Sequence, residues 1–184
     1  RPHRLRWRPA LHRPVAHGAV TVRGFFAVGV WHPKHEVNVG SVWRTAHLYG
    51  ASMIFTVGRR YADRQSSDTT AARLSIPLIH FADVDDLVRH LPYGAPLVGI
   101  ELDPRARPLG GYAHRPAACY LFGAEDHGLS PDVRDRCHDL VQIEAVAPWS
   151  MNVANAAAIV MHHRHTAHHD RPTREVRQFV KAHL

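Results

Sequence analysis

Lysine is almost absent from this chain of 184 residues, because only Lys34 and Lys181 are lysines among its 23 basic residues. The other basic residues are arginines, and the formal net charge is +7. Such a surplus favours a polyanionic partner such as nucleic acid, because basic side chains that neutralise phosphates release condensed counterions. The bias toward arginine, with 17 histidines beside it, also fits a codon preference. Charge alone therefore does not decide the partner.

Cysteine and long apolar runs are also scarce. Cys119 and Cys137 are the only cysteines, and their surroundings resemble neither a disulfide framework nor a paired-cysteine metal site. The longest apolar stretches, such as 156–161, fall far short of the roughly 20 residues that a membrane helix needs. The arginine-rich beginning lacks the apolar run of a secretory signal. We therefore expect reduced thiols, no membrane span and a cytoplasmic location.

A third absence concerns glycine-rich loops. No Gly-x-Gly-x-x-Gly follows any predicted strand, which argues against a dinucleotide-binding fingerprint and against the glycine-rich loop of Rossmann-type methyltransferases. The length and an apolar fraction of 45% are sufficient for one substantial core. We expect a basic arm over 1–17, one domain over 18–170 and a tail or helix over 171–184. The arm either contacts RNA or is a solvated tail.

Short apolar runs alternate with amphipathic stretches from Gly24 onward. The runs predict strands, and the stretches predict helices at about 40–50, 83–91, 130–137 and 150–168. Asp83 has the character of a helix N-cap, and Pro131 suits a first helical turn. Strands that alternate with helices imply a parallel sheet covered on both faces, so the fold class is α/β. The expected strands are Phe25–Val30, Ser52–Val57, Pro77–Phe81, Pro96–Leu102, Ala118–Phe122 and Leu140–Ala145.

The first of three polar motifs follows the first predicted strand and reads Asn38-Val-Gly-Ser-Val-Trp-Arg44-Thr-Ala46. We expect Asn38 to close a turn and Gly40 to permit close backbone approach. Arg44 is expected near the N-terminus of the next helix, where phosphate is attracted. The alternative is that Arg44 is a surface residue and Gly40 a loop glycine.

The second motif, Phe122-Gly-Ala-Glu125-Asp-His-Gly128-Leu-Ser130, follows another predicted strand. Glycines at the carboxyl end of a parallel strand let a small molecule lie against bare backbone. The third motif, Ser150-Met-Asn152-Val-Ala-Asn155-Ala, opens the last helix, and we expect Ser150 to cap it. An ordinary turn and a simple capped helix are the alternatives when each motif is judged alone.

Together the three motifs resemble those of the knotted SPOUT methyltransferases, specifically the TrmH/SpoU-like branch that methylates ribose 2′-hydroxyls of RNA. The resemblance runs from about Phe25 to about Arg164. It implies a parallel sheet flanked by helices with a C-terminal deep trefoil knot, which periodicity could not suggest. It also implies S-adenosylmethionine as the cofactor and a homodimer that pairs through the knot region.

The resemblance also implies the site residues. The catalytic residues would be Arg44, Asn38, Glu125, Ser150 and Asn152. The cofactor-binding residues would be Ile100, Glu101, Leu121, Gly123, Ile143, Ser150 and Met151, and no metal is expected. Because guanidinium keeps its proton in proteins, we expect Arg44 to hold a phosphate and stabilise the developing oxyanion rather than act as a base. Asn152 or Ser150 would orient the hydroxyl.

Two features depart from the usual pattern of the family. Ile143 is followed by Glu144 where many members have proline, and Asn155 stands where a small serine is common. Short members more often resemble tRNA enzymes, so tRNA is the expected substrate by analogy. A ribosomal RNA enzyme, a base-directed enzyme and a non-catalytic RNA-binding protein stay open as alternatives.

Two histidine-containing segments have more than one interpretation. His165 and His169 have the spacing of metal ligands on one helix face, but no cysteine or carboxylate cluster nearby completes a site. A solvated helix end is the other interpretation. The segment Trp31-His32-Pro-Lys34-His35 precedes the first motif, and it either lines an RNA groove or forms an exposed loop.

Overall fold

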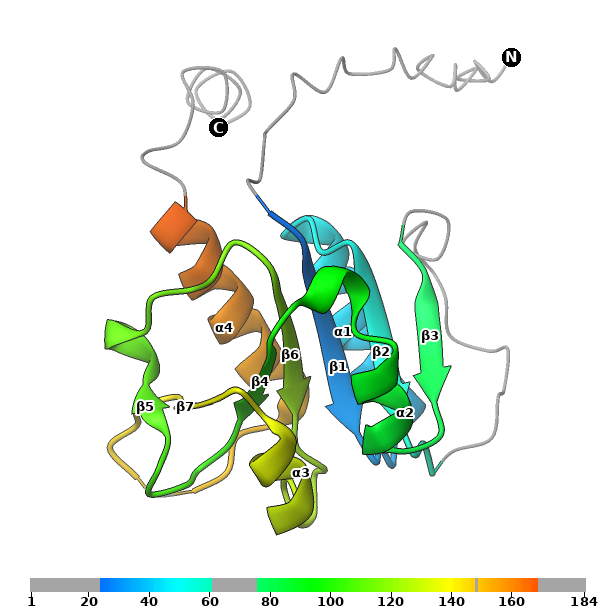
Figure 1. Cartoon of the computed structure of the whole chain (residues 1–184). Coiled ribbons are helices and arrows are strands. Elements are labelled where there is room, and N and C mark those ends of the chain that lie inside the picture. The colour runs from blue at the N-terminus through cyan, green and yellow to red at the C-terminus, as the bar shows by residue number, and fades with distance from the viewer. Residues whose placement is uncertain (1–23, 61–75, 148, 169–184) are drawn as a thin grey trace, which may run out of the picture.

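The computed structural model describes residues 24–60, 76–147 and 149–168 of the chain, which form a three-layer α/β domain. A sheet of seven strands lies between two layers of helices (Figure 1). The predicted basic arm and C-terminal tail lie outside the described residues, so both stay predictions.

The sheet is parallel throughout the described part of the chain. Its order is β3-β2-β1-β6-β4-β7-β5, and each pair of neighbours runs in the same direction. This confirms the predicted fold class. The strands are β1 (Phe26–Trp31), β2 (Met53–Val57), β3 (Leu78–Phe81), β4 (Leu97–Ile100), β5 (Arg107–Pro108), β6 (Ala118–Phe122) and β7 (Asp139–Gln142). Only β5 was not predicted, because its two residues are exposed and carry no apolar pattern.

Each face of the sheet carries two helices. Helices α1 (Glu36–Leu48) and α4 (Val153–His168) pack against each other on one face, while α2 (Val84–Arg89) and α3 (Pro131–Arg136) lie on the other face (Figure 1). The Asp83 side chain accepts a hydrogen bond from the Asp86 N–H at 2.7 Å, which confirms the predicted N-cap of α2. Pro131 is in the first turn of α3, as predicted. Short 3-10 turns occur at Pro92–Gly94 and Leu109–Gly111.

Alternation along the strands divides the core into two clusters. In β1, Val28 and Val30 belong to the cluster beneath α1 and α4, whereas Ala27 belongs to the cluster beneath α2 and α3. Successive side chains of a strand point to opposite faces, so a sheet covered on both sides needs continuous apolar runs. All six residues of β1 are accordingly buried.

Two helix starts differ from the predictions. Helix α1 begins at Glu36, not near residue 40, because Val39, Val42 and Ala46 form a buried stripe that extends the helix through Asn38 and Gly40. Asn38 therefore lies inside the first turns of α1 and closes no separate turn. Helix α4 begins at Val153, and the Asn152 side chain accepts the Ala154 N–H at 2.9 Å. The prediction that Ser150 caps this helix was wrong, since Asn152 fills that role.

Candidate active site

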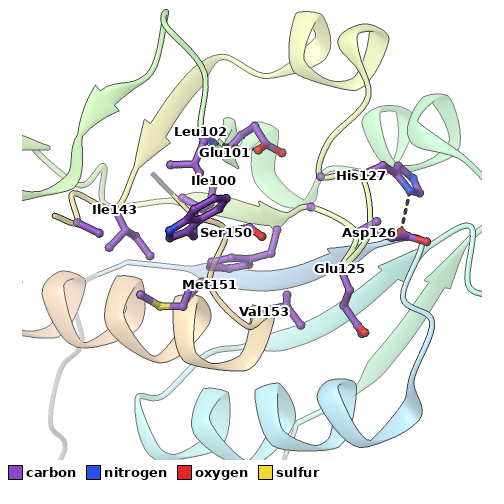
Figure 2. A pocket seen from close by; sticks show the side chains of 17 residues that line it. Ile100, Glu101, Leu102, Glu125, Asp126, His127, Ile143, Ser150, Met151 and Val153 are labelled. Atoms are coloured by element: carbon purple, nitrogen blue, oxygen red, sulfur yellow. Dashed lines mark hydrogen bonds and ion pairs between the residues drawn. The ribbon is translucent and has the colours of Figure 1, made fainter. Parts of the chain in front are cut away.

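A pocket of about 300 Å³ opens at the carboxyl ends of the central strands (Figure 2). Its walls come from three parts of the chain that are far apart in sequence: residues 100–102 after β4, residues 122–128 after β6, and residues from Ile143 to Ala156 after β7. Because β6, β4 and β7 are parallel neighbours, their carboxyl ends meet at one edge of the sheet. The second and third motifs therefore converge on one cavity, as predicted.

Most of the predicted cofactor-binding residues line this pocket. They are Ile100, Glu101, Gly123, Ile143, Ser150 and Met151. Leu121 is the exception, because its side chain is fully buried in the core cluster beneath α2 and α3. The structure therefore gives Leu121 no side-chain contact with the pocket. Trp149 also lines the pocket and is 79% exposed; sequence reasoning missed it.

The glycines of the second motif hold their loop tightly closed. Ala124 and Gly128 exchange backbone hydrogen bonds of 3.0 and 2.9 Å, and Gly128 has φ of +65°. A Cβ atom on Gly123 would lie 2.6 Å from the Cα of Gly128, which no real structure tolerates. A side chain at Gly123 would therefore push the loop apart, whereas one at Gly128 would be strained by the positive φ and would collide with the Glu101 carboxylate. The result is a wall of bare backbone beside Glu125.

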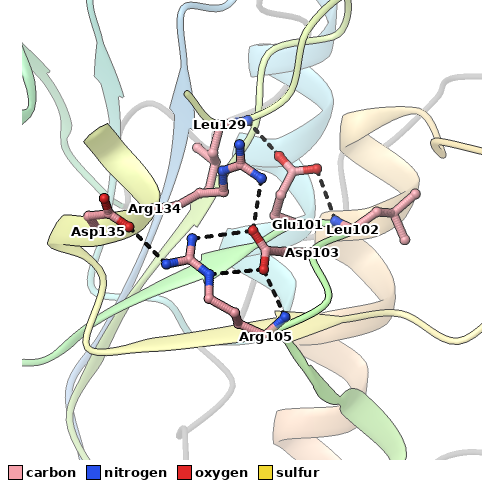
Figure 3. A network of polar contacts seen from close by, with 7 residues as sticks. All are labelled: Glu101, Leu102, Asp103, Arg105, Leu129, Arg134 and Asp135. Atoms are coloured by element: carbon pink, nitrogen blue, oxygen red, sulfur yellow. Dashed lines mark hydrogen bonds and ion pairs between the residues drawn. The ribbon is translucent and has the colours of Figure 1, made fainter. Parts of the chain in front are cut away.

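Glu101 joins two walls of the pocket. One oxygen of its carboxylate accepts the Leu129 N–H at 2.5 Å, and the other accepts the Leu102 N–H at 2.9 Å (Figure 3). The side chain thus links the segment after β4 to the segment after β6. Both of its oxygens are already engaged by backbone groups, so Glu101 shapes the cavity while it lines it.

A polar network behind Glu101 continues this connection. Asp103 is 5% exposed, and its carboxylate accepts hydrogen bonds from the Arg105 N–H at 2.8 Å and from Arg134 at 2.8 Å (Figure 3). Arg105 also donates to Asp135 at 2.8 Å. The hydrogen bonds from Arg105, and that from Arg134, lower the pKa of Asp103 to about 2. Sequence reasoning missed this network, because Arg134 and Asp135 lie 31 and 30 residues from their partners Asp103 and Arg105, and none of the four belongs to a motif.

The predicted catalytic amides and carboxylate form a chain of contacts. The Asn38 amide donates to one Glu125 oxygen at 2.8 Å, and the Asn152 amide donates to the Asn38 carbonyl oxygen at 3.3 Å. Helix α1, the loop after β6 and the start of α4 therefore meet at this point. His35 approaches the second Glu125 oxygen at 3.6 Å. All three motifs contribute to this cluster.

An ion pair lies next to Glu125. Arg60 donates to both oxygens of Asp126 at 2.9 Å each, and to the carbonyl oxygen of His32 at 2.9 Å. The hydrogen bonds from Arg60 hold the pKa of Asp126 well below its usual range. His127 lies 2.7 Å from the same carboxylate. His32 has a lowered pKa, first because it is partly buried and then because of Arg60. Asp126 and His127 line the pocket.

Glu144, where many family members have proline, also has a defined contact. Its carboxylate accepts the Gly110 N–H, with both oxygens at 3.2 Å, and this hydrogen bonding contributes to a lowered pKa of Glu144 after the bond to its own backbone. Glu144 therefore attaches the start of the loop that leads to Ser150 to the backbone of Gly110. Ser150 itself is exposed at the pocket.

Arg44 is the one predicted catalytic residue that neither lines the pocket nor belongs to the Asn38–Glu125–Asn152 cluster. It is the ninth of the thirteen residues of α1, so the prediction that it lies near a helix N-terminus was wrong. The earlier start of α1 is the reason. Its side chain is exposed, and within the described part of the chain it has no hydrogen-bond or ion-pair partner. Arg44 is thus available to a partner from outside this domain.

Two broader features complete the description. No group of three His, Cys, Asp or Glu side chains within residues 24–60, 76–147 and 149–168 is arranged to hold a metal ion. Among the same residues, no helix has the length and apolar character needed to cross a membrane. His165, one of the proposed metal ligands, packs its ring 5.7 Å from that of Tyr49.

Comparison with families of known proteins shows to which family the chain belongs. Residues 26–162 match the model of the SpoU rRNA Methylase family. The chain belongs to this family. The match covers β1 through most of α4 and includes all three motifs. SpoU membership confirms the resemblance that the motifs indicated.

Comparisons with individual proteins agree with the SpoU family assignment. The chain is 28% identical over 131 residues to the 23S rRNA (guanosine-2′-O-)-methyltransferase RlmB of Acinetobacter baylyi, covering 68% of this chain and 53% of that protein. The chain thus spans about half the length of that relative. An AdoMet-bound rRNA methyltransferase from Sinorhizobium meliloti has a TM-score of 0.67 at 24% identity, covering 78% of this chain and 57% of the other. A structure described by 2-OH methylation of C/U34 on tRNA has a TM-score of 0.66 at 23% identity, covering 79% and 97%. The two structures show that the fold is shared.

Proposed function

We propose that this SpoU-family protein is an S-adenosylmethionine-dependent RNA methyltransferase that modifies a ribose 2′-hydroxyl. One observation carries the proposal: the segments after β6 and β7, with the second and third motifs, line one pocket, and the segment after β1, with the first motif, joins them through the Asn38–Glu125–Asn152 contacts. The family match and the RlmB similarity support the same reaction.

The pocket fits the proposed cofactor. Its volume of about 300 Å³ is within the usual range of small-molecule sites, and its walls combine apolar side chains with bare backbone. Ile100, Ile143 and Met151 offer apolar surface for a heterocycle (Figure 2). The carboxylate of Glu125 offers negative charge to a sulfonium. When bound, S-adenosylmethionine supplies a methyl group that is open to nucleophilic attack.

The residues of the chain have separate roles in this proposal. A ribose hydroxyl is a poor nucleophile, so the site must hold it in line and stabilise the oxyanion that develops. Ser150, which lines the pocket, or Asn152, which contacts Asn38, would orient the hydroxyl. Arg44 would bind the adjacent phosphate and lower the energy of the oxyanion, because its guanidinium is a permanent cation. Asn38 would keep Glu125 in place through their hydrogen bond of 2.8 Å.

We also propose that the C-terminal part of the domain forms the deep trefoil knot that the family resemblance implies. The order β6-β4-β7-β5 supports it, because β7 inserts between β4 and β5 although these two strands follow each other directly in the chain. In the proposed knot, the segment from β7 to α4 would pass through the β4–β5 connection. Such threading is nearly absent from other folds. The homodimer through this region and the cytoplasmic location are proposals on the same family basis.

The substrate RNA has two candidates. We propose tRNA by analogy, because a structure that this chain covers to 97% of its length is described by 2-OH methylation of C/U34 on tRNA. Ribosomal RNA is the second candidate, and a specific observation favours it: RlmB, with 28% identity, is named for 23S rRNA. The assay must therefore contain both.

The test is methyl transfer from labelled S-adenosylmethionine to separate tRNA and rRNA pools, followed by digestion to nucleosides. We expect label in one pool, released as a 2′-O-methylated nucleoside. A matched pair of variants serves as control. Gly123→Ala should abolish transfer because its Cβ would collide with Gly128, whereas Gly111→Ala should not, because no described atom lies within 4 Å of its added Cβ. If the protein binds the cofactor but transfers no methyl group to either RNA pool, the proposed enzymatic activity is contradicted. That result would favour the alternative of a non-catalytic RNA-binding protein.

A further inference from the structure

We propose that His35 receives the proton that the ribose hydroxyl loses, by way of Glu125, and passes it to solvent. This inference rests on the proposed function. His35 belongs to none of the three motifs, and it immediately precedes α1. Its Nε2 atom lies 3.6 Å from one Glu125 oxygen, and the other Glu125 oxygen accepts the Asn38 amide.

The contacts of the other acidic groups at the pocket leave Glu125 as the acceptor. Both Glu101 oxygens accept backbone N–H groups, from Leu102 and from Leu129. Both Asp126 oxygens accept from Arg60, which stabilises the ionised form of that carboxylate. Glu125 differs, because one of its two oxygens faces an imidazole and not a fixed donor. Glu125 is thus the pocket carboxylate with an oxygen open to proton transfer.

The position of His35 suits a proton outlet. His35 immediately precedes α1 and Asn38 lies in its first turn, so both side chains reach Glu125 from the same end of the helix, one at each carboxylate oxygen. The His35 side chain is 56% exposed, whereas that of Glu125 is 20% exposed. The pair therefore extends from the pocket wall to water. Lys34 and Glu36 flank His35 in the chain, and the groups next to Glu125 are Asp126, His127 and Arg60.

The role of His35 follows from the proton that the ribose hydroxyl loses during methyl transfer. As the ribose oxygen forms its bond to the methyl carbon, the carbon–sulfur bond breaks with its electron pair left on sulfur, and the O–H bond of the ribose breaks. One proton must therefore leave the site. It moves to the open Glu125 oxygen and then to the His35 imidazole, whose Nε2 atom lies 3.6 Å from that oxygen and can accept it. His35 then releases it to water.

The decisive experiment compares His35→Gln with the wild-type protein across pH. Histidine is a side chain that can change its charge near neutral pH, so the wild-type protein and the variant should differ in how their rates depend on pH. Glutamine does not titrate, and positioned proton acceptors contribute on the order of 100-fold to a rate. We expect His35→Gln to be at least tenfold slower than the wild-type protein in alkaline buffer, with the ratio of the two rates decreasing as the pH is lowered. Calorimetry should show equal affinity for S-adenosylmethionine in both proteins.

A matched control is available on the opposite face of the sheet. His90 lies 3.2 Å from Asp86 on α2, with a side-chain exposure of 63%, so His90→Gln removes a similar histidine–carboxylate pair remote from the pocket. It should leave the rate and its pH dependence unchanged. A constant ratio of wild-type to His35→Gln rates at all pH values would overturn the role of His35. A wild-type protein that binds no cofactor and methylates no RNA would instead overturn the proposed function.

Discussion

Arg44 stands apart from the other predicted catalytic side chains. It lies on α1, as Asn38 does, but Asn38 is held by Glu125 and Asn152 whereas Arg44 is exposed and does not line the pocket. Six residues separate the two on a helix with 3.6 residues per turn, so they project in different directions. An arginine that contacts an RNA phosphate needs this freedom, because the substrate approaches from outside.

Arg44→Ala should therefore separate catalysis from cofactor binding. We expect the methylation rate to fall by about 100-fold or more, since one charged contact to the developing oxyanion is lost. The affinity for S-adenosylmethionine and the thermal midpoint should not change, because the side chain lies outside the pocket and is exposed. Arg89→Ala, on exposed α2, is the control. A near-normal rate in the Arg44 variant would refute the assignment.

At the scale of elements, the pocket depends on a connection between two loops. Asp103 and Glu101 tie the segment after β4 to the segment that leads into α3, through Arg134 and the Leu129 N–H. Asp103 does not line the cavity, whereas Glu101 does. The contact of Asp103 with Arg134 and the contact of Glu101 with the Leu129 N–H both hold the walls of the cavity together. Positioning of this kind is needed for a site to bind its ligand in one geometry.

Asp103→Asn tests this connection. The substitution keeps the shape of the side chain but removes the charge that two arginines share. We expect about a tenfold weaker affinity for S-adenosylmethionine with a smaller change in kcat, because the wall moves while the catalytic cluster stays. Asp85→Asn, which removes the exposed carboxylate paired with Arg136, is the matched control. Equal cofactor affinity in Asp103→Asn and wild type would show that the network has no role at the pocket.

A second buried network joins α4 to the segment before β6. Arg164 is 2% exposed and donates to the carbonyl oxygens of Arg115 and Pro116 at 2.7 and 2.9 Å. His114 lies 2.6 Å from the Tyr120 hydroxyl and 2.8 Å from His163. Burial first, and then His163 and Arg164, lower the pKa of His114 to about 3.

This pKa predicts acid sensitivity of the fold. Unfolded His114 takes up a proton below about pH 6.5, whereas the folded protein resists it until about pH 3, so the unfolded state binds more protons in this range. Stability should thus be greatest above pH 6.5 and decrease as the pH falls, by up to about 1 kcal/mol per pH unit. Denaturant titrations at pH 7.5, 6.0 and 5.0 measure it. His114→Gln should flatten the decrease, and an identical slope in both proteins would contradict the assignment.

The elements themselves were largely predictable from the sequence, since β1 and β6 are continuous apolar runs and Asp83 and Pro131 mark helix starts. The start of α1 was not, because Asn38 and Gly40 have the character of turn residues and only packing of Val39 and Val42 on the sheet overrides them. Local propensity cannot register a contact that tertiary structure supplies.

The candidate site was predictable only where residues belong to motifs. Glu125 and Asn152 were found this way, and the structure brings them together through Asn38. Asp103 and Arg60 were missed, because the partners that define them are 31 and 66 residues away. A carboxylate that is buried and paired looks in the sequence like one on a solvated surface.

At the scale of the whole molecule, the chain presents apolar side chains on its helical surface. Leu48 and Val37 on α1 are 75% and 66% exposed, and Ile159 on α4 is 38% exposed. Helices α1 and α4 pack on the same face of the sheet (Figure 1). The proposed homodimer would cover such residues.

Light scattering coupled to size exclusion tests the dimer. We expect a mass near twice the 20.7 kDa of one chain. Leu48→Glu should shift the mass toward the monomer if α1 takes part, because a charge would be placed among apolar contacts. Glu36→Gln, a change at the other end of α1, serves as the control. A monomeric wild-type protein at all accessible concentrations would contradict the dimer.

The central claim is that one pocket of this chain directs a methyl group to ribose. Mass spectrometry of nucleosides from RNA treated with the protein and trideuteromethyl-labelled S-adenosylmethionine tests it most directly. Fragmentation separates the base from the sugar of each labelled nucleoside. The claim predicts that the added mass stays with the ribose. Label on the base, or no labelled nucleoside from tRNA and rRNA alike, would contradict it.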